Sequence, residues 1–597
     1  MAVKLTRREM LKLSGMLAAG AFLAGCKPQP EPTEEPAAPE DTVQDTPAPV
    51  VQELLELDCS TYWLYSEPAA NNANDIVTPY VEEMFNVKFN VFGYPEQSLE
   101  EAYALNKAAG TLPDIWGPGG RLGALKLASF GDFADMTDYL PDMPNYTRYL
   151  DTATWPRYQT DGRYLSLPRI ATNGNAPEFA DNVYYGGFGV WPLLAREDIL
   201  AKCGYDFTPL PEIAKNSTDK GVWPTLEELA IEPAIDTPEK FDELLYKIKE
   251  LGIEVGGRPL SPINSINWSV FHISTMMDNG HWRVNDEGEV DGYLGLPGAK
   301  PWYKMWSRWY RDGLLEKDYV IQKNDQLQTK WATGQAAIGL MVPDLLAARQ
   351  ALAAEDPTAI VRPIPWPKAD DRYGFFDIFE CGFTTFVFNK DLGEDNLARI
   401  MEMSDFLSTA EGQAIRAWGP PDAGLYVTGS DGKKQWKDEE TRANIMENLP
   451  DVKNADYYGL EMDGSRQANR LFHSLPMMGQ CVEADPRYNY PAKLVIEQVV
   501  PRVYSKHLNC SYNTDGRATY GDGDNVASVN AAYWGDSFTA GNISKLLTSA
   551  NDTEFDAAWD EVYAKFYEDG DYELAQADMV KWFAEFAPEG LREKVKA

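Results

Sequence analysis

Alternating hydrophobic periods between residues 57 and 116 constrain the fold of this chain more than any other feature. Three segments have the alternating or β-branched pattern of strands, and two between them have the apolar spacing of amphipathic helices: strands at 60–66, 87–92 and 112–116, helices at 75–85 and 99–109. This order predicts a parallel sheet with right-handed crossovers. Ligands of such sheets bind beyond the carboxyl ends of the strands. We therefore expect the segments after Ser66, Phe92 and Trp116 to face a binding cleft.

Further helices are expected along the rest of the chain. Thr237-Pro238 is a helix start, because proline is tolerated in the first turn, and Gly252 is a helix end. Between them, one face of the helix carries Phe241, Leu244, Leu245, Ile248 and Leu251. The remaining helical segments are predicted at 304–310, 398–407, 411–418, 554–567 and 572–583. Strand and helix patterns in both halves of the chain indicate an α/β protein.

The N-terminus has the features of an export signal. Basic residues precede an apolar run at 13–25, which is too short to cross a hydrocarbon core of ~30 Å as a helix. The run ends in Leu-Ala-Gly-Cys at 23–26, which resembles a bacterial lipobox. We expect residues 1–26 to be a signal peptide and Cys26 to carry the lipid. Arg7-Arg8 resembles a twin-arginine signal; a Sec signal that contains two arginines is the alternative.

Residues 27–53 are rich in Pro, Glu, Asp, Thr and Ala and hold few large apolar side chains. Such a segment cannot bury enough apolar surface to fold, so we expect a disordered, acidic tether. Because a lipid on Cys26 would anchor the chain without a membrane-spanning helix, the tether would hold the body away from the membrane.

Charge and cysteine content exclude several classes of protein. The 597 residues carry 92 acidic and 54 basic side chains, for a net charge of −38, which argues against nucleic-acid and anionic-membrane partners. Five cysteines besides Cys26 are scattered and form no C-x-x-C, so neither a disulfide framework nor a zinc ribbon is expected. A bridge between Cys481 and Cys510 is the alternative to buried free thiols. The body is long enough for two or three domains.

Four ordered motifs lie between residues 57 and 426. Residues 111–116 read TLPDIW, residues 194–200 read LAREDIL, residues 331–339 read WATGQAAIG, and residues 410–413 read AEGQ. This ordered set resembles the motifs of the extracellular solute-binding proteins of ABC-type sugar importers, in particular the large lipoprotein branch of family 1. In the third motif, a helix is expected to end at Gly334 before a strand of small and branched residues. The resemblance implies that this strand crosses back between two lobes.

The resemblance implies a periplasmic-binding-protein-like type II α/β fold, with two α/β lobes joined by crossing hinge strands. We assign residues 54–175 and 327–395 to lobe 1, and residues 176–326 and 396–597 to lobe 2. A ligand would bind between the lobes of a monomer that needs no cofactor. The implied partners are the transmembrane permease subunits of an ABC transporter. The implied location is the outer face of the cytoplasmic membrane, extracellular or periplasmic.

A carbohydrate requires aromatic platforms for its C–H faces and planar polar groups for its hydroxyls. The chain has 17 Trp and 31 Tyr residues, many in segments that follow strands. We expect ligand binding by residues of both kinds: Trp63, Tyr65, Glu67, Trp116, Arg121, Trp191, Trp268, Trp366, Asp377 and Glu380. For each aromatic side chain, packing in the core is the alternative. Trp302, Trp306 and Trp309 have helical spacing and are expected in the core, and Asp114 is expected to have a structural role.

Enzymatic alternatives have less support, and we expect no catalytic residue and no metal site. Trp534-Gly535-Asp536-Ser537 echoes an esterase block, but the last histidine, His507, precedes that serine, so the order of catalytic residues fails. Residues 521–525 depart from the EF-hand ladder, and a polar turn is expected there rather than a calcium loop. A secreted glycoside hydrolase needs only two facing carboxylates, so it remains an alternative function. A surface carbohydrate-binding adhesin is a second alternative.

Overall fold

The computed structural model describes residues 53–61, 74–93, 99–118, 121–150, 158–160, 162–169, 193–265, 282–285, 287–340, 345–365, 367, 369, 385–430, 432, 434–448, 458–460, 469–477, 517–518, 542–586 and 589–596. Residues 53–597 form one compact unit, separate from residues 1–52. The expected signal peptide, Cys26 and the tether up to residue 52 lie outside the described residues.

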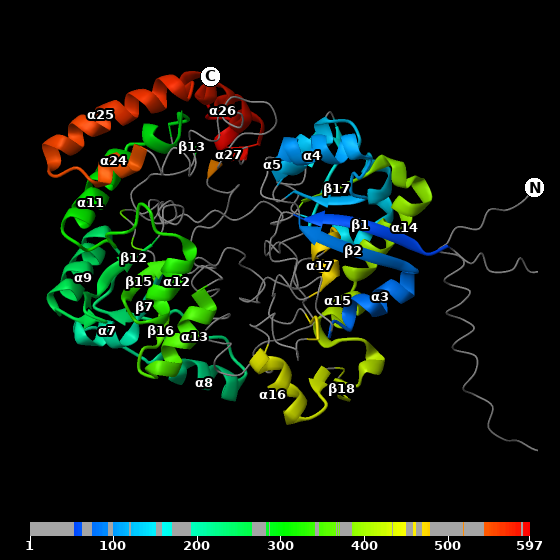
Figure 1. Ribbon diagram of the computed structural model, residues 1–597, viewed down its shortest axis with the longest axis horizontal. Helices are drawn as coiled ribbons and strands as arrows, with labels where there is room; N and C mark the ends of the chain where they lie inside the picture. The colour runs from blue at the N-terminus through cyan, green and yellow to red at the C-terminus, as the bar shows by residue number, and fades with distance from the viewer. Residues whose placement is uncertain are drawn as a thin grey trace, which may run out of the picture. The chain divides into compact units, whose positions relative to one another are not determined.

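The first of two main sheets contains the strands expected near the N-terminus (Figure 1). β1 (Leu55–Thr61) pairs in parallel with β2 (Val87–Gly93) and with β3 (Ile115–Gly117). Helices α3 (Val77–Phe85) and α4 (Leu99–Ala109) connect these strands, which confirms the predicted alternation. The first strand begins five residues earlier than expected, at Leu55.

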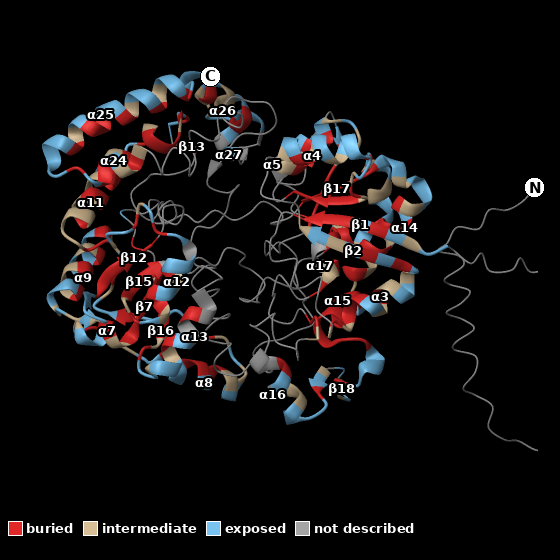
Figure 2. Cartoon of the chain, viewed as in Figure 1, coloured by how far each residue is buried: buried red, intermediate tan, exposed pale blue. Residues whose placement is uncertain are grey.

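Two strands from later in the chain complete this sheet, in the order β2-β1-β3-β17-β6. β17 (Thr385–Phe388) runs antiparallel to β3 and to β6 (Leu167–Pro168). One face packs Trp116 and Val387 against α4 and α5 (Arg121–Ser129). The buried side chains of the other face, among them Ile115 and Phe386, share a core with α3 and α14 (Glu394–Leu407) (Figure 2). The sheet is therefore covered on both faces.

The second sheet has the order β12-β15-β7-β16, with bounds Ser261–Asn264, Ala336–Leu340, Leu193–Arg196 and Val361–Ile364. β12 and β15 are parallel, and β7 is antiparallel to both of its neighbours. α12 (Asn324–Ala332) precedes β15, so the helix and strand predicted around Gly334 are confirmed. α13 (Leu345–Glu355) follows that strand.

Two long helices of this region form as the sequence predicted. α9 (Pro238–Glu250) begins with the Thr237 side chain accepting a hydrogen bond from the N–H of Lys240, and it buries the expected apolar face. α11 (Ala299–Arg311) buries Trp302, Trp306 and Trp309 completely, so these three rings belong to the core.

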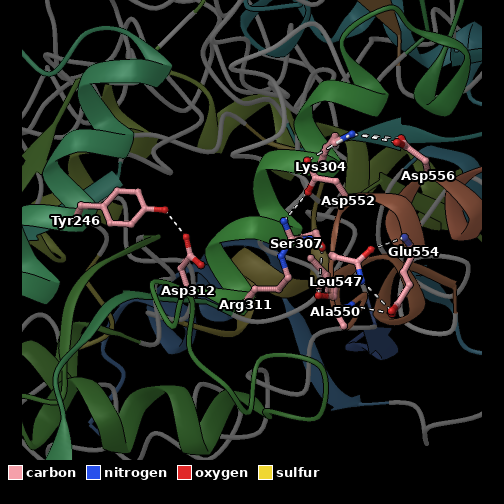
Figure 3. A network of polar contacts seen from close by, with 11 residues as sticks. Tyr246, Lys304, Ser307, Arg311, Asp312, Leu547, Ala550, Asp552, Glu554 and Asp556 are labelled. Atoms are coloured by element: carbon pink, nitrogen blue, oxygen red, sulfur yellow. Dashed lines mark hydrogen bonds and ion pairs between the residues drawn. The ribbon is translucent and has the colours of Figure 1, made fainter.

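The C-terminal helices extend the core around α11. α24 (Ser544–Leu547) and α25 (Asp552–Asp569) pack against α11, and α26 (Tyr572–Phe586) packs against α25. Ion pairs reinforce the contact: Lys304 Nζ lies 3.2 Å from Asp556 Oδ2, and Arg311 Nη2 lies 2.7 Å from Asp552 Oδ1 (Figure 3). On the other side of α11, the Tyr246 hydroxyl donates a hydrogen bond to Asp312, at the C-cap of the helix.

Strand pairing differs from the predicted assignment of segments to lobes. β15 and β16, expected in lobe 1, belong to the second sheet, whereas only β17 of that segment joins the first. α14 and α15 (Ala410–Trp418), expected in lobe 2, share the core of the first sheet. The physical reason is that a strand pattern gives no information about its hydrogen-bonding partner. The boundaries of the two lobes remain a proposal.

A buried ion pair joins β16 to the start of α7 (Glu197–Lys202). The Arg362 guanidinium is fully buried, with Nη1 3.3 Å from Glu197 Oε1. The same group donates to the carbonyls of Thr208, at 3.3 Å, and Leu229, at 3.0 Å. Its Cζ lies 4.6 Å from the centroid of the Phe207 ring. Arg362 therefore links the second sheet to several segments that follow β7.

Replacing Arg362 by methionine should lower the free energy of unfolding by about 3–5 kcal/mol, because it leaves the Glu197 carboxylate buried without its cation. Burial already raises the pKa of Glu197, against the opposing effects of the Leu210 N–H and Arg362. Urea unfolding followed by circular dichroism measures the change. The double variant R362M/E197Q should recover part of the loss, because no buried charge remains. A single variant as stable as the parent would contradict the assigned role.

Asp75 lies at the start of α3 and is 7% exposed. Its Oδ1 accepts hydrogen bonds from the N–H groups of Val77, at 3.0 Å, and Thr78, at 2.9 Å, which would otherwise have no partner in the first turn. Burial raises the pKa of Asp75 to about 6, and the hydrogen bonds from Thr78 oppose this shift. The folded protein therefore binds a proton here more tightly than the unfolded chain.

This raised pKa predicts a loss of stability as pH rises from about 4 to about 6. In that window the folded state holds more protons than the unfolded state, so stability falls with pH, by on the order of 2–3 kcal/mol for this group. The D75N variant keeps an accepting oxygen but cannot titrate. The difference in unfolding free energy between parent and variant, measured from pH 3.5 to 7.5, should change by this amount. A constant difference would contradict the prediction.

Candidate functional site

Three strand ends meet at one edge of the first sheet. Thr61, the last residue of β1, pairs with Gly117, the last residue of β3. β17 begins at Thr385, and Val387 of this strand pairs with Trp116 of β3. The carboxyl ends of β1 and β3 and the amino end of β17 therefore lie together. In open α/β sheets, this is the edge at which ligands bind.

Most of the predicted first-sheet ligand residues flank this edge in the sequence. Trp63, Tyr65 and Glu67 follow Thr61 by two, four and six positions, and Asp377 and Glu380 precede Thr385 by eight and five. These five lie outside the described residues, and their role remains a prediction. Arg121 opens α5, four residues after β3, and only its backbone is described.

Trp116 is the one predicted ligand residue whose side chain the structure describes. It is fully buried, in an apolar cluster with residues of α4 and α5 that include Ala124 and Leu127. Packing is therefore the role that the structure shows for this ring. A contact with ligand remains a prediction.

The second sheet has an equivalent edge. Leu193, the first residue of β7, pairs with Leu340 at the end of β15 and with Ile364 at the end of β16. β12 runs parallel to β15 and ends at the same edge, where Asn264 pairs with Gly339. Three strands therefore end where the fourth begins.

The three predicted tryptophans of this region all adjoin that edge in the sequence. Trp191 precedes β7 by two residues, Trp268 follows β12 by four, and Trp366 follows β16 by two. All three lie outside the described residues. Their proximity to this edge in the sequence is what motivates their predicted role.

Sequence reasoning missed a pair of buried amides at the same edge. Asn264 ends β12 and is fully buried, and Gln322, which is 5% exposed, comes from the turn before α12. Gln322 Nε2 donates to Asn264 Oδ1 and to the carbonyl of Ser265, both at 2.8 Å. Neutral amides form no recognisable motif, so the sequence carries no signal for this contact.

Asp114 has the structural role that the sequence favoured. Its Oδ2 accepts the N–H of Asp58 at 2.9 Å, and its own N–H donates to the Asp58 carbonyl at 2.8 Å. Burial raises its pKa, and the hydrogen bond from Asp58 opposes the shift. The side chain thus fastens the segment before β3 to β1.

A metal site has little basis in the described part of the chain. Its His, Cys, Asp and Glu residues form no group of three that could hold a metal ion, and none of its helices is long and apolar enough to span a membrane. Cys59 is a buried free thiol whose pKa is raised by burial, and Cys203 is free and half-buried. Cys481 and Cys510, and the polar turn expected at residues 521–525, lie outside the described residues.

Comparisons with known proteins give matches at the level of structure alone. No protein-family model matches the chain, and no curated protein matches its sequence. Among solved structures, the alginate-binding protein AlgQ2 without calcium ion is 15% identical, with a TM-score of 0.56 over 88% of this chain and 98% of its own.

Two further structures are similar over comparable lengths. An HMO-binding, ABC-transporter-associated solute-binding protein from Bifidobacterium longum infantis has 12% identity, a TM-score of 0.56 and coverage of 90% of this chain and 99% of its own. The Streptococcus pneumoniae substrate-binding protein FusA, in complex with kestose, has 14% identity, a TM-score of 0.54 and coverage of 89% and 99%.

The chain has a periplasmic-binding-protein-like α/β fold. This finding confirms the fold class that the sequence predicted, and the similar structures are solute-binding proteins of the kind that the motifs resembled. At these identities the likeness shows a shared fold.

Proposed function

We propose that this protein is an exported lipoprotein that binds a mono- or oligosaccharide between two lobes and delivers it to the permease of an ABC transporter. The observation that carries the proposal is the alignment of strand ends at one edge of each sheet, next to aromatic residues in the sequence. In the sequence, Trp63 and Tyr65 follow a strand that ends at the first edge, and Trp191, Trp268 and Trp366 lie beside strands that meet at the second. The fold is shared with proteins described as binding alginate, HMO and kestose.

The chemistry of these segments suits a carbohydrate. Indole and phenol rings offer flat apolar faces for the C–H groups of a sugar ring, and carboxylates such as Glu67 and Asp377 accept hydrogen bonds from its hydroxyls. Binding and release then require motion of one sheet and its helices against the other, which is the hinge closure that such two-lobed proteins use. A binding protein of this type needs no catalytic group.

A soluble sugar should stabilise the protein against heat. The full chain with Cys26→Ala, to prevent lipidation, would be mixed with kestose, alginate oligosaccharides, human milk oligosaccharides and common monosaccharides. At 100 times its Kd, a ligand adds about 2.7 kcal/mol to the free energy of unfolding, and differential scanning fluorimetry detects this as a rise in Tm. Intrinsic tryptophan fluorescence should change with the same sugar.

The same assay separates the alternatives. Release of reducing ends from an oligosaccharide would indicate a glycoside hydrolase. Binding without compaction in small-angle X-ray scattering would favour an adhesin. If no sugar changes Tm or fluorescence, the carbohydrate proposal fails.

Membrane attachment should depend on one sulfur atom. In a bacterial host, the intact chain should incorporate radiolabelled palmitate and sediment with membranes. Cys26→Ala should abolish the label and release the body into the periplasm or medium, because a thioether-linked lipid requires that thiol. Cys59→Ala serves as the matched control, since this buried thiol should not affect labelling. Labelling of the Cys26→Ala chain would refute the anchor.

A further inference from the structure

The amide pair at the end of β12 leaves two buried polar atoms without a hydrogen-bond partner. Asn264 Nδ2 and Gln322 Oε1 are both buried and both unpaired. Leaving a donor or acceptor buried and unpaired costs stability, so such atoms require an explanation. This pair lies at the edge of the second sheet where β12, β15 and β16 end.

The hydrogen-bond network fixes the orientation of both amides. The Gln322 side-chain amide faces the backbone carbonyl oxygen of Ser265. Because this oxygen can only accept a hydrogen bond, the amide must present its nitrogen to it. That nitrogen also donates to Asn264, so the atom facing it must be the Asn264 oxygen. A donor, Nδ2 of Asn264, and an acceptor, Oε1 of Gln322, are thereby left over.

The surrounding backbone holds the pair in place. The turn that carries Gln322 is closed by its N–H donating to the Asp318 carbonyl at 2.7 Å. Lys330 in α12 anchors the same turn through Asp318, at 3.1 Å. At Gly339, a Cβ atom would lie 2.6 Å from the Asn264 carbonyl oxygen and 2.8 Å from Trp331 Cζ2, so only glycine permits this close packing. These contacts hold the backbone next to both members of the pair.

We propose that Asn264 and Gln322 together bind one hydroxyl group of the ligand, with Asn264 Nδ2 donating to its oxygen and Gln322 Oε1 accepting its proton. A hydroxyl is both donor and acceptor, which matches the pair, whereas a carboxylate would satisfy only Asn264 and an ammonium only Gln322. The inference rests on the proposed carbohydrate function and names the group that this edge recognises. Both residues are neutral, so the site selects a polyol rather than a charged ligand.

The test compares apolar variants of similar shape in the full chain carrying Cys26→Ala. With whichever sugar of the panel stabilises the parent, N264L and Q322M should each raise the Kd about 10-fold in isothermal titration calorimetry. Without sugar, the double variant N264L/Q322M should be as thermally stable as the parent or more so, because it removes both unpaired atoms. A purely structural amide pair would give a lower Tm and an unchanged Kd, and this result would overturn the proposal.

Gln413 provides a matched control. It is 1% exposed, and its Nε2 donates to the Ser408 carbonyl at 2.9 Å and the Tyr149 hydroxyl at 3.3 Å. Q413M should therefore lower Tm and leave the Kd unchanged.

Monodeoxy analogues of the bound sugar identify the hydroxyl. One analogue should bind the parent protein about 10-fold more weakly than the intact sugar does. The same analogue and the intact sugar should bind N264L/Q322M with equal affinity. If every analogue weakens parent and double variant equally, the assignment is wrong. A parent that binds no sugar in the panel would instead defeat the proposed function, so the two failures are distinguishable.

Discussion

Backbone pairing between strands that are distant in the sequence is the constraint on which the rest of this structure depends. β17 pairs with β3 across 273 positions, from Ile115 to its partner Phe388. In the second sheet, β15 and β16 pair with the two sides of β7. Each pairing fixes the register of a whole strand, because a slip of one residue would turn every side chain to the other face. The strand ends are aligned as a result, and each sheet acquires one edge at which several connecting segments start or finish.

Buried polar contacts tie the surrounding segments to this framework. Arg362 links β16 to Glu197 and to the carbonyls of Thr208 and Leu229, so that loops of the second sheet are fixed by a single guanidinium. Five donors in a rigid plane make arginine suited to this role. In the first sheet, Asp114 joins the segment before β3 to β1 through its side chain and backbone together. These contacts fix the segments that precede and follow the strands.

The amide pair of Asn264 and Gln322 lies at the edge of the second sheet. Its members bond to each other and to Ser265 but keep one free donor and one free acceptor. A buried amide with an unused donor or acceptor requires an explanation, and ligand binding is one. The position of the pair, at the edge flanked by the segments of Trp191, Trp268 and Trp366, connects this departure with the ligand that the fold is suited to bind.

Local pattern was sufficient to predict several elements of this protein. The apolar spacing of α9, the tryptophan face of α11 and the helix and strand on either side of Gly334 all follow from the sequence, because periodicity and capping act between residues a few positions apart. The tertiary structure alone decided which sheet each strand joins, so that β15 and β16 lie with β7 while β17 lies with β3. It alone also brought Asn264 and Gln322 together, since contacts between neutral side chains 58 positions apart leave no trace in a single sequence.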